Sequence, residues 1–428
     1  MTEYTVHTKG IYHGLPTFPN QHDMSAIVVG TNGISGKYMV DVLSEAPSRW
    51  KKIFSLSRKP PSITLPTQVT HVSIDLLASV ETIAAQLRTH GVHADYVFFF
   101  AYIQPPPKPG SDNSLWSDAD ELVRVNTALL SNFLAALATN GTPPKHIVLQ
   151  LGAKYYGVHL GPTAIPQVES QPRVTLEPNF YYPQEDLLVE FCTAHRASWT
   201  TTRPSQIVGA ATTVVMNLAL PLGIYATVQR HLHQKLVYPA DLRAWETPMD
   251  LSTARMNAYL AEWAALTPGA RDQSFNVCDG SPFTWRLFWP MLAAHFGIEG
   301  EGPPDEGAGG DVVWRERRTA YDPPPRGYGG PGVRRYRFLL TEWAKSEPVR
   351  RAWREIVEQT GVRWDEVVED VDAVFGFADN SLGVSYPSYF SMGKARKLGF
   401  LGYVDSCESL FQTLREFVDL KLLPPLEG

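Results

Sequence analysis

Short apolar runs alternate with amphipathic stretches through the first half of the chain. Runs such as Tyr96–Phe100 have no polar alternation, as expected for a strand covered on both faces. The pattern predicts an α/β Rossmann fold, a doubly wound parallel sheet with helices on both faces. The expected strands are Ala26–Gly30, Ile53–Ser57, His71–Ile74, Tyr96–Phe100, His146–Leu151 and Thr200–Ile207, and the expected helices are Lys37–Leu43, Val80–Thr89, Asp118–Ala138 and Gln184–His195.

From about residue 210 the pattern changes to helices with fewer strands, because Trp, Leu and Phe recur at helical spacing. We therefore expect an N-terminal extension over residues 1–23 and a Rossmann domain over residues 24–210. Residues 211–428 should form a smaller, mainly helical substrate-binding lobe that interleaves with the Rossmann core. Within that lobe Glu299–Arg335 is rich in Gly, Pro and charge, which predicts a long surface loop.

Composition narrows the classes of protein. The chain of 428 residues is 44% hydrophobic and 19% charged, with a formal net charge of −6, which argues against nucleic-acid or anionic-membrane partners. Its three cysteines, Cys192, Cys278 and Cys407, lie far apart, so neither a zinc site nor a disulfide framework is expected. The N-terminus lacks the apolar core of a secretory signal, and no run is long enough to span a bilayer. A cytoplasmic protein is expected.

The segment SAIVVGTNGISGKYMVDVL reads as a strand, a glycine turn and a helix. Gly30 permits the tight turn, Gly33 lets the backbone approach a diphosphate, and Gly36 lets the helix pack close to the strand. The helix N-terminus adds amide donors and a positive dipole end. This context predicts a dinucleotide site, with cofactor contacts from Gly30, Thr31, Asn32, Gly33, Ile34, Ser35 and Gly36.

The end of the second strand, IFSLSRKP, indicates which dinucleotide binds. Proteins that prefer NAD place Asp or Glu there to hold the ribose hydroxyls, whereas this chain has Ser57, Arg58 and Lys59. Two cations suit a 2′-phosphate, so NADPH/NADP+ is the expected cofactor of the 24–210 domain. Asp75 follows the next strand, where it could contact adenine or cap a helix.

The catalytic pair of a typical short-chain dehydrogenase, Tyr-x-x-x-Lys on one helix, is absent, because none of the 18 tyrosines has Lys four residues later. Either the protein binds nucleotide without chemistry, or it builds the pair from separate segments. The sequence favours the second, since Lys154 follows a parallel strand at the carboxyl edge of the sheet. Tyr181 and Tyr182 open the next helix above the same edge, and Tyr182 is the better candidate for simple aromatic packing.

These residues carry a family resemblance from about residue 24 to the C-terminus. The chain resembles the progesterone 5β-reductase/iridoid synthase family (PRISE) of atypical extended short-chain dehydrogenases/reductases, in particular its fungal branch. The motifs GTNGISG, SLSRKP, ADYVFFFAY, LGAKYYG, NFYYPQED, RPSQIVG and MNL follow in the family's order, and SFNVCDGSPFTWRLFW and SMGKARKLGFLGY match its C-terminal lobe.

The resemblance assigns the catalytic tyrosine to Tyr181 and the catalytic lysine to Lys154. It implies an oxidoreductase of secondary metabolism that reduces an enone or enal in the conjugate (1,4) sense, with Tyr181 donating a hydrogen bond to the developing oxyanion. Two differences from the plant members of the family affect which substrate this protein would bind. Gln206 stands where plant members often have Asn, and the Glu299–Arg335 loop is longer than in plant enzymes.

The family geometry also implies the walls of the pocket, whose aromatic and Met side chains suit a small lipophilic substrate. Asn126 could order this site or be a satisfied core amide. Further cofactor contacts are expected from Phe100, Ala101, Pro204 and Ile207, and substrate contacts from Tyr102, Gln206, Met216, Tyr386 and Tyr389, with Phe99 in the same ring of segments.

Other functions remain open at this stage. The same Tyr/Lys pair would serve carbonyl (1,2) reduction, and the scaffold could host a non-redox cyclase or an NmrA-like nucleotide sensor. His231 and His233 point away from one another on a helix and have no third ligand nearby, so no metal site is expected. By analogy with the family, a homodimer is a plausible assembly for this chain.

Overall fold

The computed structural model describes residues 5–61, 64–106, 116–212, 216–304, 312–363 and 370–426. Its centre is a 7-stranded sheet in the order β12-β8-β7-β6-β3-β4-β5, in which every pair is parallel. The strands are β3 (Met24–Val29), β4 (Trp50–Ser57), β5 (Val69–Ser73), β6 (Tyr96–Phe99), β7 (His146–Gln150), β8 (Ser198–Pro204) and β12 (Gln273–Val277). The predicted Rossmann fold is confirmed, with all six expected strands in place.

One strand of the central sheet was not expected. Residues 273–277 lie in the stretch predicted to be mainly helical, yet as β12 they pair with β8 at the edge of the sheet. The chain thus returns to the Rossmann core after leaving it. The expected strand Thr200–Ile207 is also split, because β8 ends at Pro204 and the short β9 (Gln206–Val208) pairs instead with β11 (Leu251–Thr253).

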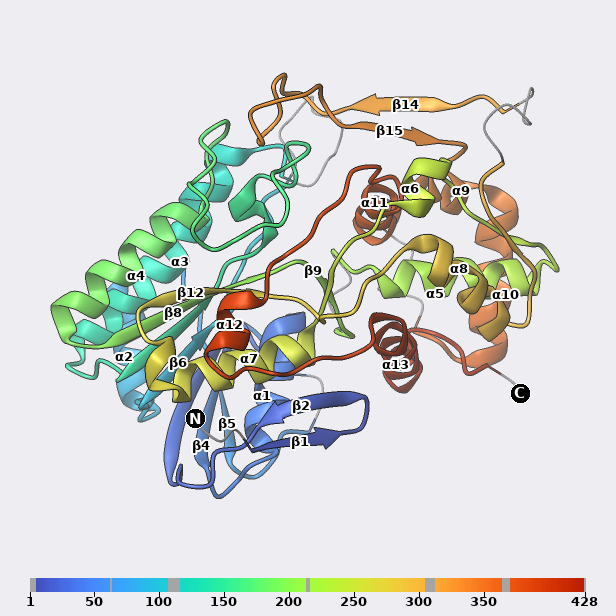
Figure 1. The fold of residues 1–428 in the computed structure, drawn as a ribbon. Coiled ribbons are helices and arrows are strands. Elements are labelled where there is room, and N and C mark those ends of the chain that lie inside the picture. The colour runs from blue at the N-terminus through green and yellow to red at the C-terminus, as the bar shows by residue number, and fades with distance from the viewer. Residues whose placement is uncertain are drawn as a thin grey trace.

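Helices cover both faces of the sheet (Figure 1). On one side α1 (Ile34–Ser44) packs against α7 (Ala254–Leu266), and on the other α3 (Ala119–Thr139) packs between α2 (Val80–Thr89) and α4 (Tyr181–His195). The four helices predicted in this half are therefore confirmed. The N-cap of α3 is Asp118, whose carboxylate accepts from the Glu121 amide at 3.1 Å.

The sequence analysis predicted no segment long enough to span a bilayer. By length and composition, however, α3 could cross a membrane. Half of the window concerned is buried inside the fold. Its inward positions include Leu130, Phe133 and Leu137, each fully buried against the sheet layer. A core helix between two neighbours meets the same criteria, so this finding is weak evidence for a membrane.

The C-terminal half builds a second core, lined by the large buried side chains Tyr225, Tyr238, Trp285, Trp289 and Trp353. The amphipathic segments predicted there are helical. The helices are α5 (Ala219–His231), α6 (Leu242–Glu246), α8 (Trp285–His295), α9 (Leu340–Lys345), α10 (Glu347–Thr360), α11 (Val371–Leu382) and α13 (Ser406–Asp419), while α12 (Gly393–Lys397) lies beside β12. The exact domain boundaries stay a prediction.

The described parts of the Gly/Pro-rich segment include strands, where a surface loop was predicted. Within it β13 (Gly300–Glu301) pairs with β10 (Leu236–Val237), and β14 (Arg315–Arg318) pairs antiparallel with β15 (Val333–Tyr336). An ion pair joins the second pair across the strands, since Glu316 of β14 binds Arg335 of β15, and Glu316 also binds Arg318 on its own strand. Local composition did not reveal these strands, because ion pairs and a distant partner strand stabilise them rather than an apolar face.

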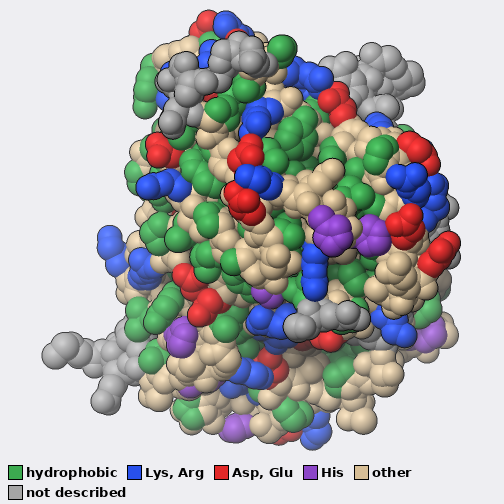
Figure 2. Space-filling view, turned by 90° about the vertical axis from the view of Figure 1, so that its right-hand side faces the viewer, with side chains coloured by type: hydrophobic (Ala, Val, Ile, Leu, Met, Phe, Trp, Pro, Cys, Tyr) green, Lys and Arg blue, Asp and Glu red, His purple; other side chains and the backbone are tan. Residues whose placement is uncertain are grey.

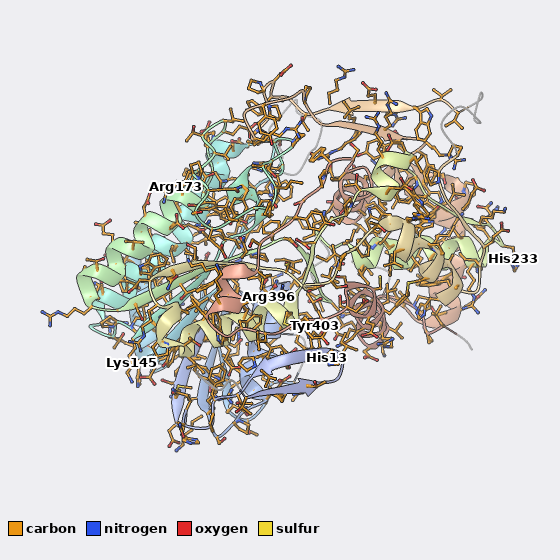
Figure 3. All side chains as sticks on the ribbon, in the orientation of Figure 1. His13, Lys145, Arg173, His233, Arg396 and Tyr403 are labelled. Atoms are coloured by element: carbon orange, nitrogen blue, oxygen red, sulfur yellow. The ribbon has the colours of Figure 1, made fainter. Side chains whose placement is uncertain are left out.

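Peripheral features complete the fold. The N-terminal hairpin of β1 (Val6–Lys9) and β2 (Tyr12–Pro16) reaches the C-terminal part of the chain, where His13 stacks on Tyr403 with ring centroids 5.2 Å apart (Figure 3). His231 forms an ion pair with Glu355 at 2.8 Å, and His233 lies at the outer edge of the molecule (Figure 3).

The surface shows charges of both signs. On the face that Figure 2 presents, Lys and Arg side chains are interspersed with Asp and Glu rather than gathered into one basic area. Within the described ranges of the chain, no group of three or more His, Cys, Asp or Glu could hold a metal ion.

Candidate active site

The site lies where the strand order reverses. From β3 the chain runs outward to β4 and β5 in one direction and to β6, β7 and β8 in the other, and ligands of such sheets bind at the carboxyl ends beside this reversal. Gly30 follows β3 with φ +89°, and a Cβ there would stand 2.8 Å from the Ala101 amide nitrogen after β6. Only glycine lets the two strand ends approach this closely.

The glycine turn fits a diphosphate. A Cβ on Gly36 would collide with the Gly30 carbonyl, so the start of α1 can press against the turn only without a side chain. Gly33 is the N-cap of α1 and provides no side-chain hydrogen bond to the helix. The first amides of a helix have no partner within it, so these donors and the positive dipole end face the crevice.

One cavity of about 1500 Å³ joins the glycine turn to the C-terminal lobe. Its wall contains nearly all of the residues predicted for cofactor and substrate, which come from segments far apart in the sequence. Those lining it are Gly30, Asn32, Gly33, Ile34, Ser35, Gly36, Ser57, Arg58, Lys59, Asp75, Phe100, Ala101, Tyr102, Lys154, Tyr181, Pro204, Gln206, Ile207, Met216 and Tyr386.

Three expected residues lie elsewhere. Thr31 is buried, and its hydroxyl is 2.8 Å from that of Ser55. Tyr389 is not in the wall, whereas its neighbour Ser388 is, because adjacent residues of an extended segment point in opposite directions. Phe99 belongs to the core, where its ring packs on Phe133 with centroids 5.9 Å apart.

The end of β4 presents two cations to the cavity. Within the described part of the chain neither Arg58 nor Lys59 forms an ion pair, and the strand ends in Ser57 rather than in a carboxylate. Asn32 of the glycine turn donates to the Lys59 carbonyl at 2.8 Å, which holds the two segments together. Asp75 caps no helix, since its carboxylate accepts from the Leu77 amide and the N-cap of α2 is Ser79.

Lys154 and Tyr181 reach the same wall from two elements. Lys154 lies in the short 3-10 helix η1 (Ala153–Tyr156) directly after β7, and Tyr181 is the first residue of α4. The Tyr181 hydroxyl lies against Gly152, where an added Cβ would be 2.8 Å from it. Asn179 links the pair, because its side chain donates to the Lys154 carbonyl at 2.9 Å and accepts from the Tyr181 amide at 3.0 Å.

The two functional groups share the cavity without a direct hydrogen bond. Among the described residues the Tyr181 hydroxyl has no hydrogen-bond partner, and the Lys154 ammonium lies over the Trp116 ring, 2.9 Å from its centroid. Burial raises the pKa of Tyr181, so its phenol is protonated at neutral pH. Burial also lowers the pKa of Lys154 well below its usual value, opposed by the nearby Glu177 carboxylate.

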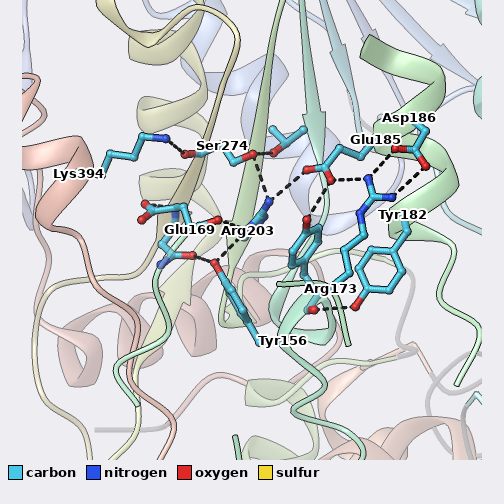
Figure 4. Close-up of polar contacts among 12 residues, drawn as sticks. Tyr156, Glu169, Arg173, Tyr182, Glu185, Asp186, Arg203, Ser274 and Lys394 are labelled. Atoms are coloured by element: carbon cyan, nitrogen blue, oxygen red, sulfur yellow. Dashed lines mark hydrogen bonds and ion pairs between the residues drawn. The ribbon is translucent and has the colours of Figure 1, made fainter. Parts of the chain in front are cut away.

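A buried ion-pair network fixes the start of α4 (Figure 4). The Glu185 carboxylate accepts from Arg203 of β8 at 3.1 Å, from Arg173 at 2.9 Å and from the Tyr155 hydroxyl of η1 at 2.9 Å. Asp186 binds the outer side of Arg173. The helix that carries Tyr181 is thereby tied both to the sheet and to the 3-10 helix that carries Lys154.

Tyr182 belongs to this scaffold rather than to the cavity. Its hydroxyl accepts from the Val174 amide and donates to the Tyr155 carbonyl, both at 2.8 Å. Of the two adjacent tyrosines, Tyr181 alone lines the cavity. The sequence-based preference for aromatic packing at Tyr182 agrees with this arrangement.

Asn126 orders the part of the cavity wall that contains Tyr102 and Ile103. This fully buried amide accepts from the Ile103 N–H at 2.8 Å and donates to the Ile103 carbonyl at 2.9 Å. It thus fixes the segment of Tyr102, whose ring packs on Phe180 with centroids 5.7 Å apart. The Tyr102 hydroxyl accepts from the Trp116 indole at 2.8 Å, so the aromatic wall around the Tyr181 ring is held by polar contacts as well.

Sequence reasoning missed four residues of this site. Asn179 and Gly152 each stand two positions before a predicted catalytic residue, in NFYY and LGAK, so their places in these motifs could have identified them. Trp116 and Arg334 had no such signal. They come from irregular chain and from the predicted loop, and only tertiary packing brings them to the cavity.

The fold and the site together define a Rossmann-fold protein of the short-chain dehydrogenase/reductase class, with a lysine and a tyrosine supplied by separate segments. Residues 26–321 match the PRISE-like Rossmann-fold domain. The chain belongs to this family, as its motifs had indicated.

Relatives of similar length carry reductase and synthase names. The chain is 28% identical to a short-chain dehydrogenase of Penicillium aethiopicum, covering 94% of this chain and 99% of the relative. It is also 28% identical to a 3-oxo-Δ(4,5)-steroid 5β-reductase of Arabidopsis thaliana, covering 93% of each chain. For the (S)-8-oxocitronellyl enol synthase of Catharanthus roseus the identity is 28%, with 93% and 92% covered.

Solved structures support the fold. The UDP-glucose 4-epimerase of Thermotoga maritima superposes with a TM-score of 0.57 at 14% identity, over 93% of this chain and 99% of that one. At such identity the likeness concerns architecture alone. Family membership and the named relatives identify the chain as an NAD(P)-dependent oxidoreductase.

Proposed function

We propose that this protein is an NADPH-dependent reductase that performs conjugate (1,4) reduction of an enone or enal of a small lipophilic substrate. The observation that carries the proposal is the Tyr181 hydroxyl, free of hydrogen-bond partners among the described residues and facing the cavity that the glycine turn opens. The steroid 5β-reductase and oxocitronellyl enol synthase names of the relatives are in keeping with this reaction class. Substrate and reaction type are the proposed part.

In the proposed mechanism, side chains of this protein bind and polarise the substrate. NADPH, when bound at the turn, supplies the hydride. Tyr181, protonated because burial raises its pKa, donates a hydrogen bond to the substrate oxygen on which negative charge develops. Negative charge on that oxygen favours the protonated form of Lys154, which stabilises the oxyanion once substrate displaces the lysine's contact with Trp116. Tyr102 and Phe180 provide an aromatic wall beside Tyr181.

Protonation of the substrate's α-carbon does not require a further side chain. His159 lines the cavity, but burial and the Lys154 charge lower its pKa to about 3, so it is neutral at physiological pH. Water reaching the cavity can supply that proton. The reaction balances as enone, NADPH and one proton giving the saturated carbonyl compound and NADP+.

The cofactor preference gives a prediction about Arg58 and Lys59. Replacing both with alanine removes two cations that would bind the 2′-phosphate, each contact to a charged group being worth about 1.5–3 kcal/mol. We expect kcat/KM with NADPH to fall at least about 100-fold, while kcat/KM with NADH is unchanged. Steady-state rates with both cofactors measure this. An unaltered preference for NADPH would mean that other residues read the phosphate.

Gly152 gives a prediction about placement of the tyrosine. An alanine Cβ there would stand 2.8 Å from the Tyr181 hydroxyl, although the extended backbone accepts any residue. We expect Gly152→Ala to lower kcat by about 10- to 100-fold, because small displacements of a reacting group have effects of this size. The Kd for NADPH, measured by fluorescence titration, should stay near that of the wild type. A normal kcat would place the functional hydroxyl elsewhere.

The proposal is tested by following NADPH oxidation with a panel of enones, enals and saturated ketones, and by identifying the products. Saturated ketones formed from enones support conjugate reduction. Allylic alcohols would favour carbonyl (1,2) reduction instead. Tight NADPH binding without consumption by any member of the panel would contradict the proposal and favour a sensor or a non-redox cyclase on the same scaffold.

We also propose a cytoplasmic location and a role in secondary metabolism. The three cysteines are free and buried, which is in keeping with a reducing compartment. The expected partner is the small-molecule substrate, without nucleic acid or membrane, and a homodimer remains the proposed assembly. Size-exclusion chromatography with light scattering measures the assembly directly.

A further inference from the structure

The end of the cavity in the C-terminal lobe holds a half-buried arginine. Arg334 of β15 lines the cavity together with Asn380 and Tyr386. Its guanidinium donates to the Asn380 side-chain oxygen at 2.9 Å and to the Tyr386 hydroxyl at 2.8 Å. Both partners are neutral, and the Nε atom is buried without an acceptor.

The charge of Arg334 is not balanced by a protein carboxylate. Within the described residues it forms no ion pair, and the carboxylates in the cavity wall are engaged elsewhere. Asp250 accepts from the Phe390 amide at 2.6 Å, and Glu177 accepts from the Tyr321 hydroxyl at 2.7 Å. Asp379, beside Asn380 on α11, accepts from two backbone amides and the Thr341 hydroxyl.

An unpaired guanidinium in a protein interior is costly, and such charges are normally paired. Here an anionic ligand bound in the cavity can balance the charge of Arg334. The Tyr386 hydroxyl already accepts from Arg334, so its own proton is left to donate to a ligand. Its ring packs against Gly332, where a Cβ would collide with it, so the segment before β15 fixes the tyrosine in place.

The anion that this end would bind is not the cofactor's phosphate. Arg58 and Lys59 follow β4 of the central sheet, whereas β15, which carries Arg334, lies beside α11 of the C-terminal lobe (Figure 1). Arg334 therefore lines the part of the cavity that the C-terminal lobe contributes, and not the strand end that carries Arg58 and Lys59. This is the lobe proposed to bind the substrate.

We propose that Arg334 and Tyr386 form a carboxylate-binding subsite, and that the physiological substrate is an enone bearing a carboxylate at the end remote from the reacting double bond. That the substrate is an enone rests on the proposed function. That it bears a carboxylate rests on the contacts of Arg334. The guanidinium is planar and matches two carboxylate oxygens. The remaining wall, including Met216 and Phe377, suits the apolar body of such a molecule.

The test compares two ligands that differ in charge and by a single methyl group, chalcone-4-carboxylate and its methyl ester, on protein loaded with NADP+. Calorimetry gives the Kd of each ligand for the wild type, Arg334→Met and Arg334→Lys. We expect the wild type to bind the carboxylate at least about tenfold more tightly than the ester. Arg334→Met should lose this preference while binding the ester as the wild type does, and Arg334→Lys should keep part of it.

Tyr386→Phe provides a second variant if Arg334→Met is unstable. It removes one donor and keeps the charge, so the preference for the carboxylate should fall by less than in Arg334→Met. Equal binding of acid and ester by the wild type, or equal losses for both ligands in Arg334→Met, would overturn the subsite. Because binding is measured without turnover, a failure of enone reduction is seen separately, in the absence of NADPH oxidation with either ligand.

Discussion

Tyr181→Phe is expected to lower kcat for enone reduction by about 100- to 1000-fold, the effect of removing one preorganised donor to an oxyanion. The phenol ring stays in its contact with Phe180, whose centroid is 4.5 Å away, so the wall of the cavity is preserved. The hydroxyl alone is lost. Stopped-flow rates under single turnover isolate the chemical step from product release.

The matched control is Tyr182→Phe. Its hydroxyl bonds the backbone of Val174 and Tyr155 and does not line the cavity, so this variant should lose stability but keep most of its kcat. The Kd for NADPH should be the same in both variants. If Tyr181→Phe retained the wild-type rate, or if Tyr182→Phe lost as much, the assignment of the donor would be wrong.

Glu185→Ala is expected to destabilise the protein by about 3–5 kcal/mol, because it leaves the Arg203 guanidinium buried without its anion. The side chains of the pair are 11% and 3% exposed, so solvent cannot replace the lost partner. Unfolding in urea, followed by intrinsic fluorescence, measures the free energy of unfolding. The variant should also lose kcat, since the same contacts hold the start of α4.

Asp186→Ala is the control for that change. This neighbour binds Arg173 on the surface with 65% of its side chain exposed, and exposed ion pairs contribute about 0–1 kcal/mol. We therefore expect a loss several times smaller than for Glu185→Ala. Equal losses would show that the network in Figure 4 acts through general packing rather than through the buried charge.

The parts of the fold that the sequence predicted are those with a local physical signal. Strands buried on both faces require apolar runs, which is why β3 and β6 stand out in the sequence. Lys154 and Tyr181 could be expected together because carboxyl ends of parallel strands converge at one edge. The glycines at 30 and 36 were interpretable because only a missing side chain permits those approaches.

The parts that the sequence did not predict depend on distant partners. Strand β12 owes its conformation to β8, some seventy positions earlier in the chain, and not to its own pattern. Trp116 lies over Lys154 through the packing of irregular chain, which no periodicity describes. Arg334 was hidden in a segment whose Gly and Pro content predicts a loop, although its strand is stabilised by ion pairs.

The central claim is that this cavity delivers hydride to the β-carbon of an enone. The most direct measurement supplies NADPH deuterated at C4, with each face labelled in turn, together with 2-cyclohexenone or a 3-oxo-Δ4 steroid, and locates the label in the product by NMR. We predict deuterium on the β-carbon of a saturated ketone, from one labelled face only. Deuterium on the carbinol carbon of an allylic alcohol would contradict conjugate reduction, and so would a product that carries no label with either labelled face.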